Sequence, residues 1–152
     1  MNVNDIKTLM IDIPHFYEMT QEELGLLADS LKYRKIRSGE FIVKEGQVGS
    51  TLFYIVSGKV KISVESISEK KKTMTMRGKG TTIGELAVVG LSNIRAGTVT
   101  ALSDTELLLL SKQAYENLIE KHPRVAFKIL KSIAVQLSQR IKELSGQVVD
   151  LL

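Results

Sequence analysis

Short apolar segments separated by glycine turns fill the middle of this chain, from about residue 34 to residue 110. Val60, Ile62 and Val64 alternate with polar neighbours, which is the period of two of a half-buried strand. Turn residues return about every 8–12 positions and no helical pattern separates the strands, so the spacing predicts an antiparallel sandwich or barrel. The expected strands cover residues 41–43, 52–56, 60–64, 73–76, 98–101 and 106–110.

Residues 1–33 have the pattern of a helical lead-in. Thr20 and Glu23 form a predicted capping box, in which each side chain satisfies the backbone N–H of the other residue. Apolar residues at helical spacing follow, and Pro14 separates this helix from a shorter one over about residues 3–10.

Residues 111–152 are predicted to be helical again. Ser111 can cap a short helix through Ile119, and Pro123 suits the first turn of a long helix to the end of the chain. The long helix carries a heptad series of apolar residues that predicts a parallel homodimer, with packing against its own domain as the alternative. That series is Leu130, Ala134, Leu137, Ile141, Leu144, Val148 and Leu151.

The amino-acid composition excludes several kinds of site and several classes of protein. The chain has 152 residues, so the three zones form one domain, and it has no cysteine for a disulfide, a thiol nucleophile or a metal ligand. His15 and His122 lie too far apart for a zinc-binding spacing, so we expect no metal. No apolar run reaches the ~18 residues of a membrane span, and the N-terminus lacks a signal-peptide pattern. We therefore expect a cytoplasmic protein that has no membrane partner.

The net charge of +4 raises the question of a nucleic-acid partner. The excess comes from scattered lysines and from the run Lys70–Lys72, which we interpret as a solvated loop tip. Aromatic residues are only 5% of the chain, so few side chains are available to stack on single-stranded bases. We expect no nucleic-acid partner.

The segment from Thr82 to Val99 carries the candidate chemistry. Gly84 lets the backbone approach a ligand, and the first N–H groups of a short helix from Glu85 to Ala87 have no partner within the helix. Arg95 offers a two-pronged donor for phosphate oxygens, and the Glu85 carboxylate can accept from a sugar hydroxyl. The alternative is an ordinary turn before a helix, with an arginine that pairs with any surface carboxylate.

The quartet Gly84-Glu-Leu-Ala, followed by Arg95-Ala-Gly-Thr-Val, resembles the phosphate-binding cassette of cyclic nucleotide-binding domains. Other segments resemble this family in the same order: the lead-in 13–16, the strands and turn of 37–46, and 49–60 with its Tyr-Ile-Val-Ser-Gly. The resemblance extends over about residues 13–145.

The resemblance implies a mostly β fold, a jelly-roll sandwich with N-terminal helices and a long C-terminal helix, which holds cAMP or cGMP. It implies that Glu85 takes the ribose 2′-hydroxyl and that Arg95 takes the phosphate. It further implies that the helix at the C-terminus covers the purine. The implied ligand residues are Gly84, Glu85, Leu86, Ala87, Arg95, Ala96 and Gly97, with Ile141, Leu144 and Ser145 as the candidate cover.

Three positions near the implied phosphate site depart from the family or bear on the ligand. Ile94 replaces a common proline, which should leave the linker less rigid, and Gly97 replaces the usual second alanine, which should add backbone freedom. In the family, a Thr or Ser directly after the arginine favours cGMP. Ala96 has no hydroxyl, so the expected ligand is cAMP, with cGMP as the alternative.

Nothing in the sequence indicates an output of its own. No DNA-reading helix follows the long helix and no catalytic constellation is evident, so we expect a non-enzymatic cAMP sensor that acts through an unknown effector protein. Two alternatives remain. One is a dimeric interaction scaffold that does not depend on nucleotide, and the other is a relative of transcription regulators without their DNA-binding part.

Overall fold

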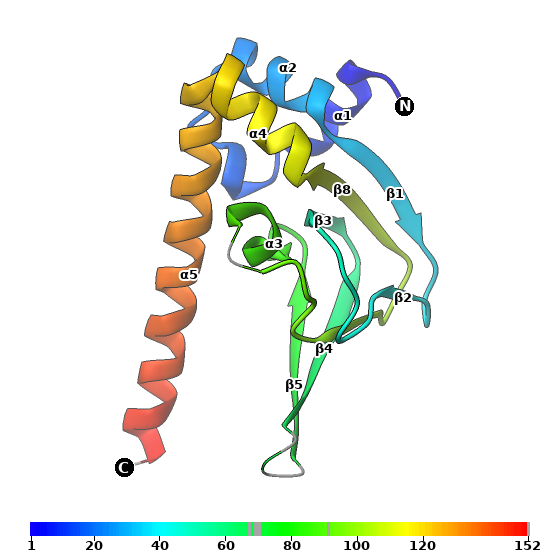
Figure 1. Ribbon diagram of the computed structural model, residues 1–152, viewed down its shortest axis with the longest axis vertical. Coiled ribbons are helices and arrows are strands. Elements are labelled where there is room, and N and C mark those ends of the chain that lie inside the picture. The colour runs from blue at the N-terminus through cyan, green and yellow to red at the C-terminus, as the bar shows by residue number, and fades with distance from the viewer. Residues whose placement is uncertain (67, 69–70, 91, 152) are drawn as a thin grey trace.

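The computed structural model describes residues 1–66, 68, 71–90 and 92–151. Two four-stranded antiparallel sheets form a sandwich, helices from both ends of the chain meet at one end of it, and the long C-terminal helix runs from there alongside the sandwich (Figure 1). The strand orders are β1-β8-β3-β6 and β2-β7-β4-β5. This arrangement confirms the expected β-sandwich with N-terminal helices and a long C-terminal helix.

The elements follow one another in a simple order. The lead-in contains α1 (Val3–Met10), the 3₁₀ turn η1 (Pro14–Phe16) and α2 (Gln21–Ser30). The sandwich contains β1 (Lys32–Ile36), β2 (Phe41–Val43), β3 (Thr51–Ser57), β4 (Lys59–Ser66), β5 (Lys71–Gly78), β6 (Thr82–Ile83), α3 (Glu85–Val89), β7 (Thr98–Ala101) and β8 (Thr105–Ser111). The chain ends in α4 (Lys112–Lys121) and α5 (Pro123–Leu151).

Strand β3 lies between two hydrophobic cores, which is why its residues 52–56 are all buried. Leu52 and Tyr54 face the helices, whereas Phe53 and Ile55 face the second sheet. Alternate side chains of a strand point to opposite faces, so a strand that is covered on both faces is apolar throughout. The helices therefore pack on one face of the sandwich, and the other face of this sheet is covered by the second sheet.

Two strands and one helix end differ from the sequence prediction. Strand β1 begins at Lys32, within the zone expected to be helical, and β6 has only two residues, too few to show a period. The predicted capping box is half formed, because the Thr20 hydroxyl accepts from the Glu23 N–H at 3.2 Å. The Glu23 carboxylate pairs with Lys128 of α5 at 2.7 Å, and tertiary contact replaces the second bond of the box.

The lysine run lies where β5 begins, rather than in a loop tip alone. Lys71 and Lys72 are the first residues of β5 and the Lys72 side chain is exposed, while Lys70 lies outside the described residues.

Among the described helices, none combines the length and the hydrophobicity that a membrane span requires.

The turn η1 joins the lead-in to the sandwich and to α5. The rings of His15 and Phe16 lie 5.5 Å and 4.8 Å from the ring of the buried Tyr54. The Nδ1 atom of His15 lies 2.8 Å from the Ser132 hydroxyl in α5. His15 is therefore an almost fully buried imidazole at the junction of three elements.

Burial makes His15 a source of pH-dependent stability. Burial lowers the pKa of His15 from 6.5 to about 4, so the unfolded chain binds the proton more readily than the folded chain between these values. The contribution is complete above pH 6.5 and is lost as the pH falls toward 4, which costs up to about 3 kcal/mol of folding free energy.

We expect His15→Gln to flatten this part of the dependence, measured by urea unfolding between pH 7 and pH 4.5. His122→Gln, which changes the chain's other histidine, should keep the slope of the unmodified protein. Equal slopes for the unmodified protein and His15→Gln would contradict the assignment.

Candidate functional site

The segment after β6 makes a sharp turn into the short helix α3. Gly84 has a φ of +81°, in the left-handed region, and forms the N-cap of α3. A Cβ at this position would lie 2.5 Å from Arg95 Nη1 and 2.9 Å from the Thr51 carbonyl oxygen. Glycine is thus required twice, by the backbone conformation and by the neighbouring guanidinium.

The Arg95 guanidinium lies in a slot whose shape depends on two glycines. A Cβ on Gly49 would lie 2.7 Å from its Nε and 2.8 Å from its Nη2, and Gly84 borders Nη1. Nη1 donates to the Thr51 carbonyl at 3.1 Å, and the Phe53 ring lies 5.5 Å from the guanidinium carbon. The side chain is therefore held by close packing, one hydrogen bond and a ring face.

Arg95 has no acidic partner in the part of the chain that the structure describes. The residue is only 8% exposed, and burial lowers the pKa of its guanidinium. A buried cation without a counter-charge is costly, and such groups are normally paired. The slot therefore presents an unneutralised guanidinium that suits an anionic ligand.

Backbone hydrogen bonds fix the loop that carries Arg95. The Arg95 N–H donates to the Gln47 carbonyl at 2.8 Å, and the Gly46 N–H donates to the Arg95 carbonyl at 2.9 Å. Val48 and Ile94 form an isolated β-bridge between the same segments. The backbone on both sides of position 94 is therefore paired with residues 46–49.

Gly97 corrects one expectation. Its φ is not positive, and a Cβ there would lie 3.0 Å from the Ser63 carbonyl oxygen and 3.1 Å from Val64. Glycine at this position serves the close approach of the loop to β4, rather than backbone freedom.

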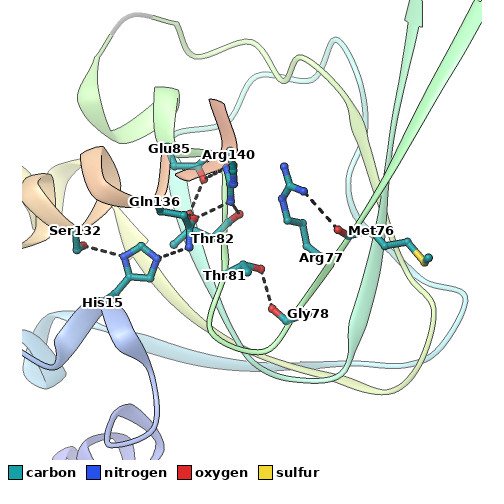
Figure 2. Close-up of polar contacts among 10 residues, drawn as sticks. All are labelled: His15, Met76, Arg77, Gly78, Thr81, Thr82, Glu85, Ser132, Gln136 and Arg140. Carbon is teal, nitrogen blue, oxygen red and sulfur yellow. Dashed lines mark hydrogen bonds and ion pairs between the residues drawn. The ribbon is translucent and has the colours of Figure 1, made fainter. Parts of the chain in front are cut away.

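Glu85, the first residue of α3, is held through one oxygen. Its Oε1 accepts from the Thr82 hydroxyl at 2.5 Å and from Arg140 Nη1 of α5 at 2.9 Å (Figure 2). Arg140 Nη2 also donates to the Thr82 carbonyl at 3.2 Å. Neither bond to the carboxylate uses Oε2, so the second oxygen is left to accept from another group.

A cavity of about 220 Å³ lies between Arg95 and Glu85. Three guanidinium groups, Arg77, Arg95 and Arg140, line it with a single carboxylate among the described residues, that of Glu85. Arg77 extends from β5 toward Arg140, and its buried Nε has no hydrogen-bond partner in the described part of the chain (Figure 2). The cavity is therefore net cationic.

The structure brings most of the expected ligand residues to this cavity. The lining includes Gly84, Glu85, Leu86, Arg95, Ala96 and Gly97, and the side chain of Ala87 lies outside the described part. The candidate cover residues Ile141, Leu144 and Ser145 do not line it, and the first two are 64% and 61% exposed. Arg140 stands at the cavity in their place. No cluster of metal-ligating side chains occurs among the described residues.

Four polar residues that line the cavity were not predicted as site residues from the sequence: Arg77, Thr82, Ser92 and Arg140. Arg77 pairs across the ladder with Val60, which is fully buried, so the period of two along residues 71–78 could have placed it on the inner face. Arg140 gives no such signal, because its position depends on how α5 lies against the sandwich.

Comparison with known proteins shows which family has this fold and this cavity-lining segment. The family model of the cyclic nucleotide-binding domain matches residues 33–122, more than half of the chain. The chain belongs to the cyclic nucleotide-binding domain family.

Relatives of this nucleotide-binding domain differ in what accompanies it. The cyclic AMP receptor protein of Thermus thermophilus is 29% identical over 130 residues, 86% of this chain and 58% of that protein. A lysophospholipase of Neurospora crassa is 26% identical over 71% of this chain, which spans 7% of the enzyme. The crystal structure of a cyclic nucleotide-binding domain from Methylobacillus flagellatus has a TM-score of 0.83 at 22% identity, over 99% of this chain and 84% of that one.

The slot around Arg95 can be tested at Gly49. Gly49→Ala places a methyl group on the guanidinium without a left-handed φ, so we expect it to displace Arg95 and to weaken cyclic nucleotide binding about tenfold. Gly25→Ala, in a helix where a Cβ meets nothing within 4 Å, should leave the affinity unchanged. Calorimetric titration with cAMP measures both, and equal affinities would contradict the slot.

Proposed function

We propose that this domain is a regulatory sensor of a cyclic nucleotide. The observation that carries the proposal is the buried, unpaired guanidinium of Arg95 on one wall of a cavity whose other wall presents Glu85. Arg95 would bind the cyclic phosphate through paired N–H donors, and Glu85 Oε2 would accept from the ribose 2′-hydroxyl. The cationic lining adds long-range attraction for a phosphate.

The ligand we propose is cAMP. Ala96 lines the cavity and has no hydroxyl to offer a guanine, and the matching Thermus relative is named a cyclic AMP receptor protein. cGMP is the alternative, and comparative titration with both nucleotides decides between them.

We propose that the output passes through a homodimer and an effector protein. The heptad series in α5 is exposed: Leu130, Leu137, Ile141 and Leu144 are between 40% and 64% exposed, and Phe127 extends the stripe at 62%. Packing of this stripe on its own domain would have buried Leu130, so the exposure favours a second copy of the helix. The side chains of Val148 and Leu151 lie outside the described part.

The domain itself is proposed to be non-enzymatic and cytoplasmic. Because the chain spans 58% of the Thermus receptor protein and 7% of the lysophospholipase, the activities of those whole proteins are not carried over. A nucleotide-independent scaffold and a relative of transcription regulators without their DNA-binding part remain the alternatives. The unpaired Arg95 argues against the first, because a scaffold has no use for a buried, unneutralised cation.

The ligand assignment is tested at Arg95. Arg95→Leu removes the cation that faces the proposed phosphate, and loss of one partner of a buried charge pair costs about 2–5 kcal/mol, so cAMP affinity should fall by a factor of tens to thousands. Arg34→Leu, which removes an exposed arginine on β1, should bind like the unmodified protein. Binding by Arg95→Leu within about threefold of the unmodified protein would exclude the proposed site.

The dimer is tested on α5. Ile141→Glu combined with Leu144→Glu places like charges across the proposed seam, so light scattering at tens of micromolar should show a monomer where the unmodified protein is a dimer. Gln139→Glu with Lys142→Glu changes two exposed residues on the side of the helix away from the proposed seam and should leave the dimer intact. A monomeric unmodified protein, or a dimer that survives the seam variant, would remove α5 as the interface.

A further inference from the structure

A continuous line of hydrogen bonds runs from the N-terminal lead-in to Glu85. His15 Nε2 lies 2.8 Å from Gln136 Nε2, and Gln136 Oε1 lies 2.7 Å from Arg140 Nη2 (Figure 2). Arg140 in turn holds Glu85 Oε1 at 2.9 Å. The line therefore joins η1, α5 and the start of α3 through side chains that are far apart in sequence.

The donor and acceptor groups of these side chains determine which atom donates in each hydrogen bond of the series. The Gln136 amide nitrogen is only a donor, so His15 Nε2 must accept and the imidazole is neutral, with its proton on Nδ1. That proton is donated to the Ser132 hydroxyl, which donates to the Ile129 carbonyl at 2.7 Å. The amide oxygen of Gln136 is turned toward Arg140 Nη2, because a flipped amide would place its nitrogen, a donor, against the guanidinium, which is also only a donor.

Gln136 also reaches the site through Thr82. The Thr82 hydroxyl lies 2.7 Å from Gln136 Oε1 and 2.5 Å from Glu85 Oε1, so one proton is shared between two acceptors. Arg140 and Thr82 both hold the same carboxylate oxygen, which leaves Oε2 turned away from these bonds. The orientation of the Glu85 carboxylate thus depends on Gln136 through Arg140, which donates to Gln136 Oε1 and to Glu85 Oε1.

We propose that Gln136, seated by His15, is a positioning residue for the ribose subsite. It holds Arg140 on Glu85 Oε1, where the Thr82 hydroxyl also lies, and so presents Oε2 to the 2′-hydroxyl of the nucleotide. This rests on the proposed function of the cavity. Because binding couplings are reciprocal, a bound nucleotide would in turn stabilise the contact of η1 with α5, and occupancy is reported to the N-terminal helices.

The first test compares cAMP with 2′-deoxy-cAMP by calorimetry. Gln136→Leu should weaken cAMP binding about tenfold and leave 2′-deoxy-cAMP within about twofold, because only the ligand with a 2′-hydroxyl uses the oriented carboxylate. Gln139→Leu, the same change one turn further along α5, should alter neither affinity. An equal loss for both ligands, or none for cAMP, overturns the positioning role. Failure of the unmodified protein to bind cAMP overturns the proposed function instead.

The second test needs no ligand. Nitrogen-15 NMR of the His15 ring in the unmodified protein should show the proton on Nδ1 at neutral pH. Gln136→Glu, which keeps the side-chain size, puts an acceptor against Nε2 and should move the proton there. A ring that already carries its proton on Nε2, or that does not respond to Gln136→Glu, would show that Gln136 does not donate to His15. That result overturns the proposal independently of which ligand the cavity binds.

Discussion

The buried guanidinium of Arg95 is the constraint on which the rest of the site depends. Gly49 and Gly84 have no side chain because the guanidinium occupies that space, and the Thr51 carbonyl and the Phe53 ring fix its remaining sides. Residues 46–49 hold its backbone in place. Three parts of the chain thus meet around the Arg95 guanidinium: the loop before β3, β3 itself and the turn at Gly84. None of the described residues neutralises this cation.

The opposite wall of the cavity is organised by α5. Glu85 begins a helix only five residues long, which cannot by itself fix a carboxylate, and Arg140 and Thr82 supply the contacts that do. The same face of α5 carries Ser132 and Gln136 against the lead-in. The long helix therefore touches the cavity and the N-terminal segment at once, while the described residues of its apolar heptad series stay exposed.

The sequence predicts those features that depend on local pattern. The strands, the helix caps at Thr20 and Ser111 and the turn at Gly84 follow from spacing or from the family resemblance, and the structure contains each of them. Glu85 and Arg95, singled out for their chemistry, line one cavity. Features that arise from tertiary contact could not be predicted in this way. Glu23 pairs with Lys128 instead of completing its capping box, and Gly97 packs closely against β4. Arg140 rather than Ile141 lines the cavity. Each of these contacts depends on how elements distant in sequence pack.

The central claim is that a cyclic nucleotide neutralises Arg95, and NMR of the unmodified protein during titration with cAMP tests it directly. The Arg95 Nε–H signal should shift to a new position at saturation, together with the backbone signals of Gly84, Glu85 and Gly97, since we propose that the phosphate and the ribose contact these groups. Signals on the outer surface of β1 should stay in place. Saturating cAMP that leaves the Arg95 Nε–H signal unmoved would contradict the claim.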